Sequence, residues 1–427
     1  MSSPSPRLPD TSDTSSASLR TDVLVVGAGP AGCAAAITLK RAGHDVVVID
    51  KATFPRDKIC GDGLTTSALR ELDALGLDPS HVESWINVGD VIVRSPSGRE
   101  VTFPLPTDGG TFAAVSRRRD LDAALVELTR SNGVDVHENV ALVSITQGTK
   151  SAMITTDSGD VIEASFVIAA DGMWSPTRKA LGLAQPGYRG EWHAFRQYFV
   201  NVSPRAAREL VVWFEPDLLP GYAWSFPLAD GSANVGFGIL RVDSSYKVSD
   251  MGALWRELLS RPHIREFLGE TAVAEGPHRA WPIPARVDRI PLSEARTLFV
   301  GDAAAATDPM TGEGIGQALL TGRWAAEAIL QHPHEPRACA MTYEHSVESE
   351  LSVDHRFAER LTAILRSPLG ARGAVRIAGL SDWTRRNFGR WLFEDYPRAL
   401  ICTPRRWHRG MFTGPGAYRG VHAHSTD

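Results

Sequence analysis

Residues 22–50 read DVLVVGAGPAGCAAAITLKRAGHDVVVID, and this stretch decides the fold. Its aliphatic, β-branched run at 23–26 is typical of a strand that is buried on both faces. Helix-forming residues follow from Ala31 to Ala42, and the run at 46–49 repeats the strand pattern. The order strand, glycine turn, helix, strand predicts a βαβ unit.

The glycine turn of this unit has the spacing of a dinucleotide-binding fingerprint. Gly27 permits a tight turn, Gly29 lets the backbone approach a pyrophosphate, and Gly32 lets the helix press on the sheet. The helix N-terminus stabilises phosphate charge. Asp50, at the end of the second strand, is placed to accept hydrogen bonds from ribose hydroxyls. The pattern predicts a dinucleotide site; the alternative is a tight structural turn without a ligand.

Two later strand ends favour FAD over NAD as the dinucleotide. The first leads into Asp171, and the second leads into Gly301 and Asp302. A flavin carries a ribityl chain with hydroxyl groups, and Asp302 is placed to hold one of them. Each of these two strand ends, taken alone, is equally consistent with an ordinary turn.

The glycines that follow the second strand also suit a flavin. Gly312 and Gly314 let a flat ring stack closely against the backbone, and Ile315 stands where the next expected helix begins. The positive end of that helix faces the flavin pyrimidine, where negative charge collects on reduction. A helix cap is the alternative interpretation.

The chain between these two nucleotide-binding parts is strand-rich and aromatic. Alternation in Tyr222-Ala223-Trp224-Ser225-Phe226 places three rings on one face of a strand. We therefore expect a discontinuous fold. Its expected parts are a disordered tail (1–20), an FAD-binding domain (21–85, 110–185 and 285–335), a β-rich substrate domain (86–109 and 186–284) and a helical, arginine-rich C-terminal region (336–427).

Composition excludes several classes of protein. A net charge of -5 over 427 residues argues against nucleic-acid binding. The four cysteines (Cys33, Cys60, Cys339 and Cys402) lie far apart, which disfavours a disulfide framework, and no residues stand at metal-ligand spacing. No apolar run approaches the roughly 20 residues that span a bilayer, and the N-terminus lacks the features of a secretion signal. These features predict a cytoplasmic protein without a metal.

Together, these motifs resemble one flavoprotein superfamily. The glycine fingerprint, the helix start Arg118-x-x-Leu121-Asp122 and the aspartates 171 and 302 are similar to those of aromatic hydroxylases, halogenases and geranylgeranyl reductases. The resemblance implies an α/β fold with a Rossmann-like FAD-binding domain of the aromatic-hydroxylase type and an inserted antiparallel sheet. It also implies that Arg118 lies near the FAD phosphates. The alternative for Arg118 is a solvated charge in a run of three arginines.

Three phrases resemble the geranylgeranyl reductase branch. The segment 54–63, FPRDKICGDG, is similar to the one that carries a cysteine beside the flavin, here Cys60. The residues 222–227, YAWSFP, match the YxWxFP substrate motif, and 308–315, DPMTGEGI, resemble NPLTGEGI with Asp308 in place of asparagine. The resemblance covers about residues 22–330. It implies an FAD-dependent oxidoreductase that saturates C=C bonds of an isoprenoid, with bacterial enzymes acting on a menaquinone tail as the nearest members.

Each of the substrate-side residues has a second interpretation. Tyr222, Trp224 and Phe226 offer rigid apolar area to a molecule with almost no hydrogen-bonding groups, but they could equally be sheet core facing a helix. Cys60 is expected to orient the substrate or protonate its carbon; the alternative is a small buried side chain beside a glycine turn.

Two rival functions share this fold. An FAD-dependent monooxygenase or epoxidase would send reduced flavin toward oxygen, and a non-catalytic carrier of prenylated molecules would have lost the flavin. The sequence leaves the electron donor open among NAD(P)H, ferredoxin and free reduced flavin.

The C-terminal segment 366–420 carries eleven arginines against three acids, with interleaved aromatic residues. One interpretation is a surface that docks on anionic lipid at the inner face of the membrane. The other is a helical cap whose arginines are solvated or paired with the acidic body.

Overall fold

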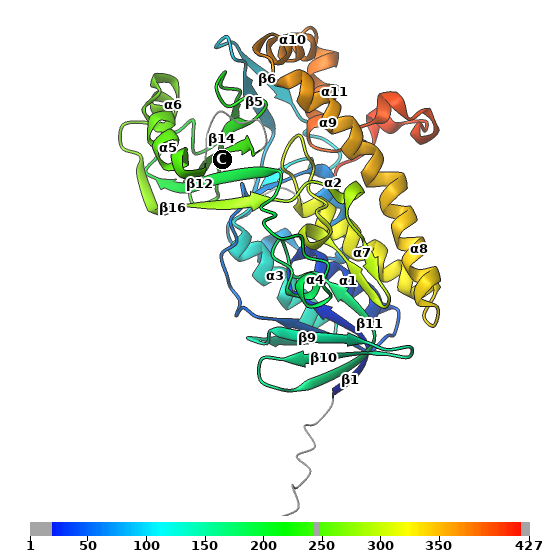
Figure 1. Ribbon diagram of the computed structural model, residues 1–427. Helices are drawn as coiled ribbons and strands as arrows, with labels where there is room; N and C mark the ends of the chain where they lie inside the picture. The colour runs from blue at the N-terminus through cyan, green and yellow to red at the C-terminus, as the bar shows by residue number, and fades with distance from the viewer. Residues whose placement is uncertain (1–18, 242–247, 420–427) are drawn as a thin grey trace, which may run out of the picture.

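The computed structural model describes residues 19–241 and 248–419 (Figure 1). The expected disordered tail, 1–20, lies outside the described residues except for Leu19 and Arg20, which begin a strand. In the described parts, three sheets and a C-terminal set of helices form a mixed α/β structure, as the sequence predicts.

The first sheet has eight strands and is built around the predicted βαβ unit. Five strands run parallel, with β1 at the centre, so that Val23 of β1 pairs with Val46 on one side and Phe166 on the other. In spatial order they are β18 (Thr297–Phe299), β11 (Val161–Ala169), β1 (Leu19–Val26), β2 (Val46–Asp50) and β8 (Asp135–Glu138). Three antiparallel strands extend it, β9 (Leu142–Gln147), β10 (Ala152–Thr156) and β17 (Ser293–Glu294).

Helices α1 (Pro30–Arg41) and α7 (Ile315–Gln331) cross at very short range beside this sheet. A Cβ on Gly322 of α7 would lie 2.1 Å from the carbonyl oxygen of Ala31, so only glycine allows the approach. Because β18 also pairs with β11, a strand from the later part of the chain extends the parallel sheet beyond β11. Three further helices belong to this part of the chain, α2 (Thr66–Leu75), α3 (Arg118–Ser131) and α4 (Pro176–Ala180).

The second sheet has seven strands, and one face of it is covered by two helices that the sequence analysis did not predict. Trp255 of the first helix packs 5.9 Å, ring centre to ring centre, from both Phe195 and Phe237. All neighbouring strands are antiparallel except β13 and β5, which pair in parallel. The spatial order is β16 (Val273–Ile283), β12 (Trp192–Val200), β15 (Ala233–Leu240), β14 (Tyr222–Pro227), β13 (Leu210–Trp213), β5 (Asp90–Arg94) and β6 (Glu100–Pro104), and the covering helices are α5 (Met251–Ser260) and α6 (Pro262–Leu268).

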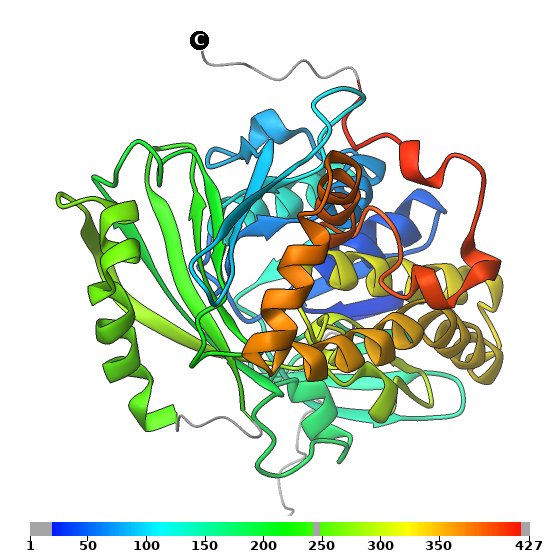
Figure 2. The same ribbon diagram turned by 90° about the horizontal axis from the view of Figure 1, so that it is seen from above.

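The C-terminal helices lie on the other side of this sheet (Figure 2). Phe388 packs 4.7 Å, centre to centre, from Phe103 of β6. Among residues 19–241 and 248–419, no helix combines the length and apolar character needed to cross a membrane. The helices are α8 (Pro336–Val347), α9 (Val353–Leu365), α10 (Pro368–Ala378) and α11 (Asp382–Leu392), with a π-helical segment, Glu348–Ser352, joining the first two.

The remaining elements are short. A three-stranded sheet in the order β3, β7, β4 joins the loop before α2 to the chain before α3. Its strands are β3 (Gly63–Leu64), β7 (Ala114–Val115) and β4 (Ile86–Asn87), and the 3-10 turns are Pro79–His81, Val248–Asp250, Val287–Arg289, Gly301–Ala304, Leu400–Cys402, Pro404–Arg406 and Met411–Thr413.

Candidate active site

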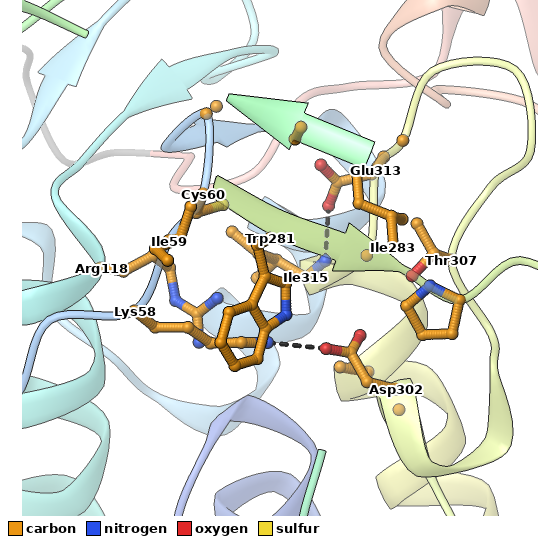
Figure 3. Close-up of a pocket in the computed structure, with 18 of the residues that line it drawn as sticks. Lys58, Ile59, Cys60, Arg118, Trp281, Ile283, Asp302, Thr307, Glu313 and Ile315 are labelled. Carbon is orange, nitrogen blue, oxygen red and sulfur yellow. Dashed lines mark hydrogen bonds and ion pairs between the residues drawn. The ribbon is translucent and has the colours of Figure 1, made fainter. Parts of the chain in front are cut away.

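One cavity of about 790 Å³ runs between the first and second sheets and under the C-terminal helices. Every site residue named from the sequence lines it, with the exception of Gly32. Figure 3 shows part of its wall, contributed by segments far apart in the chain.

The glycine fingerprint has the geometry that its sequence predicts. Gly27 has a φ of 107°, and a Cβ there would lie 2.4 Å from the carbonyl oxygen of Ala170. A Cβ on Gly32 would lie 1.8 Å from the carbonyl oxygen of Gly27, which explains why this glycine packs the helix and does not reach the cavity. Gly29 is different, because a Cβ there would meet only the tip of Arg56, at 3.7 Å. The backbone at the start of α1 is therefore open to a ligand.

Asp50 and Arg118 flank the glycine fingerprint, which is the first part of the predicted cofactor cradle. Asp50 accepts hydrogen bonds from the backbone amides of Ala28 and Ala52, each at 2.8 Å, while still lining the cavity. Arg118 is buried and forms a bidentate ion pair with Asp122, with both N–O distances at 2.8 Å. The alternative interpretation of Arg118 as a solvated charge is therefore wrong.

The second part of the predicted cofactor cradle, at Gly301 and Asp302, contains an ion pair that the sequence did not reveal. Nζ of Lys58 lies 2.8 Å from Oδ2 of Asp302, and the pair spans the cavity wall (Figure 3). Burial alone would raise the pKa of Asp302, but the Lys58 ammonium, together with Arg118 and the Thr307 hydroxyl, outweighs burial and holds this pKa below its usual range. Asp302 is therefore a carboxylate, which can accept a hydrogen bond from a ligand hydroxyl.

The N-terminus of α7 was expected to face the flavin, but two of its backbone N–H groups already have an acceptor within the protein. Oε1 of Glu313 accepts hydrogen bonds from the amides of Ile315, at 2.8 Å, and Gly316, at 2.9 Å. Burial, reinforced by the charge of Glu394, raises the pKa of Glu313. Gly312, with a φ of 71°, makes the preceding turn.

Gly301, Gly314 and Asp171 complete the set of residues predicted to bind the cofactor. Gly301 has a φ of 58°, and a Cβ there would press on Ala31 at 3.2 Å, while Gly314 approaches the Thr307 hydroxyl. Oδ2 of Asp171 accepts a hydrogen bond from the amide of Thr177 at 2.8 Å.

A buried indole N–H is available in the same cavity. Trp281 of β16 lies among the labelled side chains of Figure 3, and its Nε1 is buried without an acceptor in the described part of the chain. Together with the open backbone at Gly29, this donor fits a flat cofactor with carbonyl and phosphate oxygens. Its sequence context, an isolated tryptophan in a strand, gave no indication of this role.

The rings of Tyr222, Trp224 and Phe226 form an aromatic wall of the same cavity. Their centres are 6.0 Å and 6.1 Å apart in sequence order, and the Tyr222 hydroxyl donates to the carbonyl of Thr311. The rings therefore present carbon surface to the cavity. The apolar lining continues through Val91, Val93, Leu210, Val212, Phe214, Leu361, Leu365, Val375, Phe388, Trp391 and Leu392.

Cys60 lies where the cofactor cradle meets the aromatic wall. Its carbonyl accepts a hydrogen bond from Nδ2 of Asn234 at 2.9 Å, and Oδ1 of Asn234 accepts one from the Trp224 indole at 3.2 Å. Burial raises the pKa of the Cys60 thiol, with Arg118 opposing the effect. Cys60 is therefore a neutral thiol with a proton to give, and it is a poor nucleophile.

Two residues after Cys60 lies a buried carboxyl, Asp62, to which the sequence pattern assigned no role. Asp62 is fully buried and accepts hydrogen bonds from the Tyr198 hydroxyl, at 2.7 Å, and from Asn234, at 2.8 Å. Burial raises the pKa of Asp62 to about 6, although Arg196 and these hydrogen bonds favour the carboxylate.

Sequence comparison gives one matching family model and several relatives. The model, described as an FAD binding domain, matches residues 20–320. The menaquinone reductase of Mycolicibacterium smegmatis is 35% identical over 73% of this chain and 76% of its own. Digeranylgeranylglycerophospholipid reductase 1 of Methanopyrus kandleri is 32% identical over 73% of this chain and 80% of its own.

Solved structures share the fold at lower identity. A geranylgeranyl bacteriochlorophyll reductase-like protein from Thermoplasma acidophilum has a TM-score of 0.73 and 22% identity, covering 91% of this chain and 100% of that one. Halogenase PltM, solved in complex with FAD, has a TM-score of 0.67 and 16% identity, covering 90% of this chain and 84% of that one.

Proposed function

Because the chain belongs to the geranylgeranyl reductase family of FAD-dependent oxidoreductases, we propose that it saturates C=C bonds in the isoprenoid chain of a lipid such as a menaquinone. The predicted family, FAD cofactor and aromatic-hydroxylase type of fold are confirmed. The relatives differ in the head group that their names print, and the isoprenoid chain is what those molecules share. The proposal therefore concerns the chain and leaves the head group to experiment.

A single observation carries the proposal: the cofactor cradle and the aromatic wall belong to the same cavity. An isoprenoid has almost no polar atoms, so its binding free energy must come from apolar area removed from water. The rings of Tyr222, Trp224 and Phe226, together with the C-terminal helices, supply that area within reach of Cys60. A polar substrate would leave this wall without a role.

The two glycine motifs, with Asp50, Arg118 and Asp302, would hold FAD, which in its reduced form would supply a hydride equivalent to one alkene carbon. The residues of the chain then have three tasks. Trp224 and its neighbours hold the alkene flat, the C-terminal helices exclude water, and Cys60 gives a proton from Sγ to the second carbon. The double bond becomes a single bond, and the resulting thiolate regains its proton from solvent or from the hydrogen-bonded groups around Asp62.

The reaction consumes two electrons for each double bond, so the enzyme requires a reduced donor as well as a lipophilic substrate. NAD(P)H, ferredoxin and free reduced flavin all meet this need, and an assay should offer each in turn. Because the substrate resides in a membrane, we propose that the protein works at the cytoplasmic membrane surface as a peripheral protein.

The test is anaerobic incubation of the FAD-loaded protein with menaquinone, polyprenyl diphosphates and prenylated glycerolipids, followed by mass spectrometry. The expected product has gained two hydrogen atoms for each reduced double bond. A product that forms only with dioxygen and contains an added oxygen atom would instead identify a monooxygenase or epoxidase. A protein that cannot be loaded with FAD would be a carrier.

A further inference from the structure

Helix α10 has two apolar faces, one exposed and one buried. Leu369 and Ile377 point outward and are 76% and 65% exposed, with Leu380 just beyond the helix end at 69%. The opposite face, at three- and four-residue spacing, buries Ala371, Val375 and Ala378. A helix of a monomeric protein normally presents polar side chains to water, so the outer face of α10 indicates a further contact.

The charges on this helix have one sign. Between Arg360 and Ser381 the sequence has four arginines and no acidic residue. Arg372 and Arg376 are exposed on α10, and neither forms an ion pair within the described chain. Four arginines later in the C-terminal region differ, because each pairs with an acid: Arg385–Asp382, Arg390–Asp395, Arg398–Asp308 and Arg406–Asp354.

The inner face of α10 belongs to the cavity. Ala374 and Val375 line it, and so does Ile364 at the end of α9, which is also 56% exposed. A Cβ on Gly370 would lie 2.1 Å from the carbonyl oxygen of Ile364, so the two helices meet at this point. Ile364 therefore reaches from the cavity to the outside beside α10, which Figure 1 shows at one end of the molecule.

We propose that the outer face of α10 docks on an anionic lipid bilayer and delivers the isoprenoid chain into the cavity past Ile364. Leu369, Ile377 and Leu380 enter the acyl region, and Arg372 and Arg376 meet the lipid phosphates. This inference rests on the proposed function, since it gives the lipid substrate a route that avoids water.

A second copy of the chain fits this face less well than a bilayer does. A two-fold contact through α10 would bring Arg372 and Arg376 against the same arginines of the other copy. No acid between residues 360 and 381 is available to balance them. Anionic lipid balances the arginines and accepts the leucines together.

The experiment is flotation of the FAD-loaded full chain with vesicles of phosphatidylglycerol and phosphatidylcholine, or of phosphatidylcholine alone. The variants are Leu369→Ser/Ile377→Ser and Arg372→Glu/Arg376→Glu. The matched control is Met341→Ser/Arg337→Glu on α8, where Met341 is 62% exposed and stands roughly 35 Å along the helical rod from the end of α9. Activity is measured in parallel on a short-chain prenylated quinone in detergent micelles.

The wild type and the α8 control should float with anionic vesicles, and each α10 variant should bind them more than about tenfold more weakly. All four proteins should reduce the micellar substrate equally. Failure of the wild type to bind, or equal binding by the α10 variants, would refute the docking surface while micellar activity upheld the function. Vesicle binding without any alkene reduction would refute the function instead. A wild-type dimer that Leu369→Ser/Ile377→Ser makes monomeric would show that a second copy covers the face.

Discussion

Nε of Arg398 lies 3.4 Å from Oδ2 of Asp308, and both side chains are buried. This contact joins the C-terminal region to the loop that precedes α7. Burial would raise the pKa of Asp308, but the guanidinium, together with His355 and hydrogen bonds from the amides of Thr311 and Met310, outweighs burial and holds the pKa below its usual range. Asp308 is the position at which the resemblance expects asparagine, so Arg398 supplies the countercharge that this carboxylate requires.

Arg398→Met should therefore lower the free energy of unfolding by roughly 3–5 kcal/mol, because it leaves a buried carboxylate unpaired. FAD retention on gel filtration should fall with it, since the loop lines the cofactor end of the cavity. Asp308→Asn in the same chain should restore part of the loss. Arg385→Met is the control, because its partner Asp382 is exposed and the change should cost less than about 1 kcal/mol. Equal losses for both arginines would contradict the assignment.

The sequence could predict local structure. It could not predict contacts between residues that lie far apart in the chain. The β1–α1–β2 unit and the alternating rings of β14 follow from spacing alone. The partner of Asp302 is Lys58, 244 residues earlier, and no local pattern connects the two. Helix α5 was missed because its apolar residues follow a strand-rich stretch, and only the packed structure shows Trp255 lying on Phe237. The tail arginines likewise divide into paired and outward groups only once the fold is known.

Lys58→Met tests the ion pair with Asp302. Without the ammonium, burial should raise the pKa of Asp302, so that protonation competes with its role as an acceptor. FAD should bind about tenfold more weakly, with a larger loss at acidic pH. Flavin fluorescence titration at several pH values measures this, and Lys58→Arg should bind nearly as the wild type does. If Lys58→Met leaves the affinity for FAD unchanged, the Lys58–Asp302 ion pair does not contribute to cofactor binding.

Cys60→Ala should slow alkene reduction by about 100-fold, the usual effect of losing a general acid, while reduction of the FAD by its donor stays unchanged. Stopped-flow measurement of each half-reaction separates the two. Because burial raises the thiol pKa, alkylation of Cys60 should be slow at neutral pH and accelerate only in strongly basic solution. Cys402→Ala, which removes an exposed thiol, is the control. If Cys60→Ala reduces the alkene at the wild-type rate, Cys60 only packs in the site and does not supply the proton.

The raised pKa of Asp62 has a consequence for stability. An unfolded aspartate titrates near pH ~4, so between about pH 4 and pH 6 the folded state binds a proton more tightly than the unfolded chain does. Stability contributed by this group is therefore present at low pH and lost as pH rises through about 6. The difference in unfolding free energy between wild type and Asp62→Asn should shrink by up to about 3 kcal/mol from pH 4 to pH 7. Urea titrations at each pH measure it, and a flat difference would show that Asp62 titrates normally.

Trp224 gives the sharpest test of the aromatic wall. A Cβ on Gly236 would lie 2.4 Å from the indole, so the glycine seats the ring, and Asn234 fixes its edge through a hydrogen bond. Trp224→Leu should raise KM for a prenylated quinone about tenfold through lost apolar contact, with FAD content preserved. The KM of Trp224→Phe should lie between those of the wild type and Trp224→Leu, because phenylalanine keeps a ring and loses the hydrogen bond. Trp407→Leu, at an exposed position outside the cavity, should leave KM in micelles unchanged. If Trp224→Leu lowers kcat and leaves KM unaltered, the ring orients Cys60 through Asn234 and does not bind the chain.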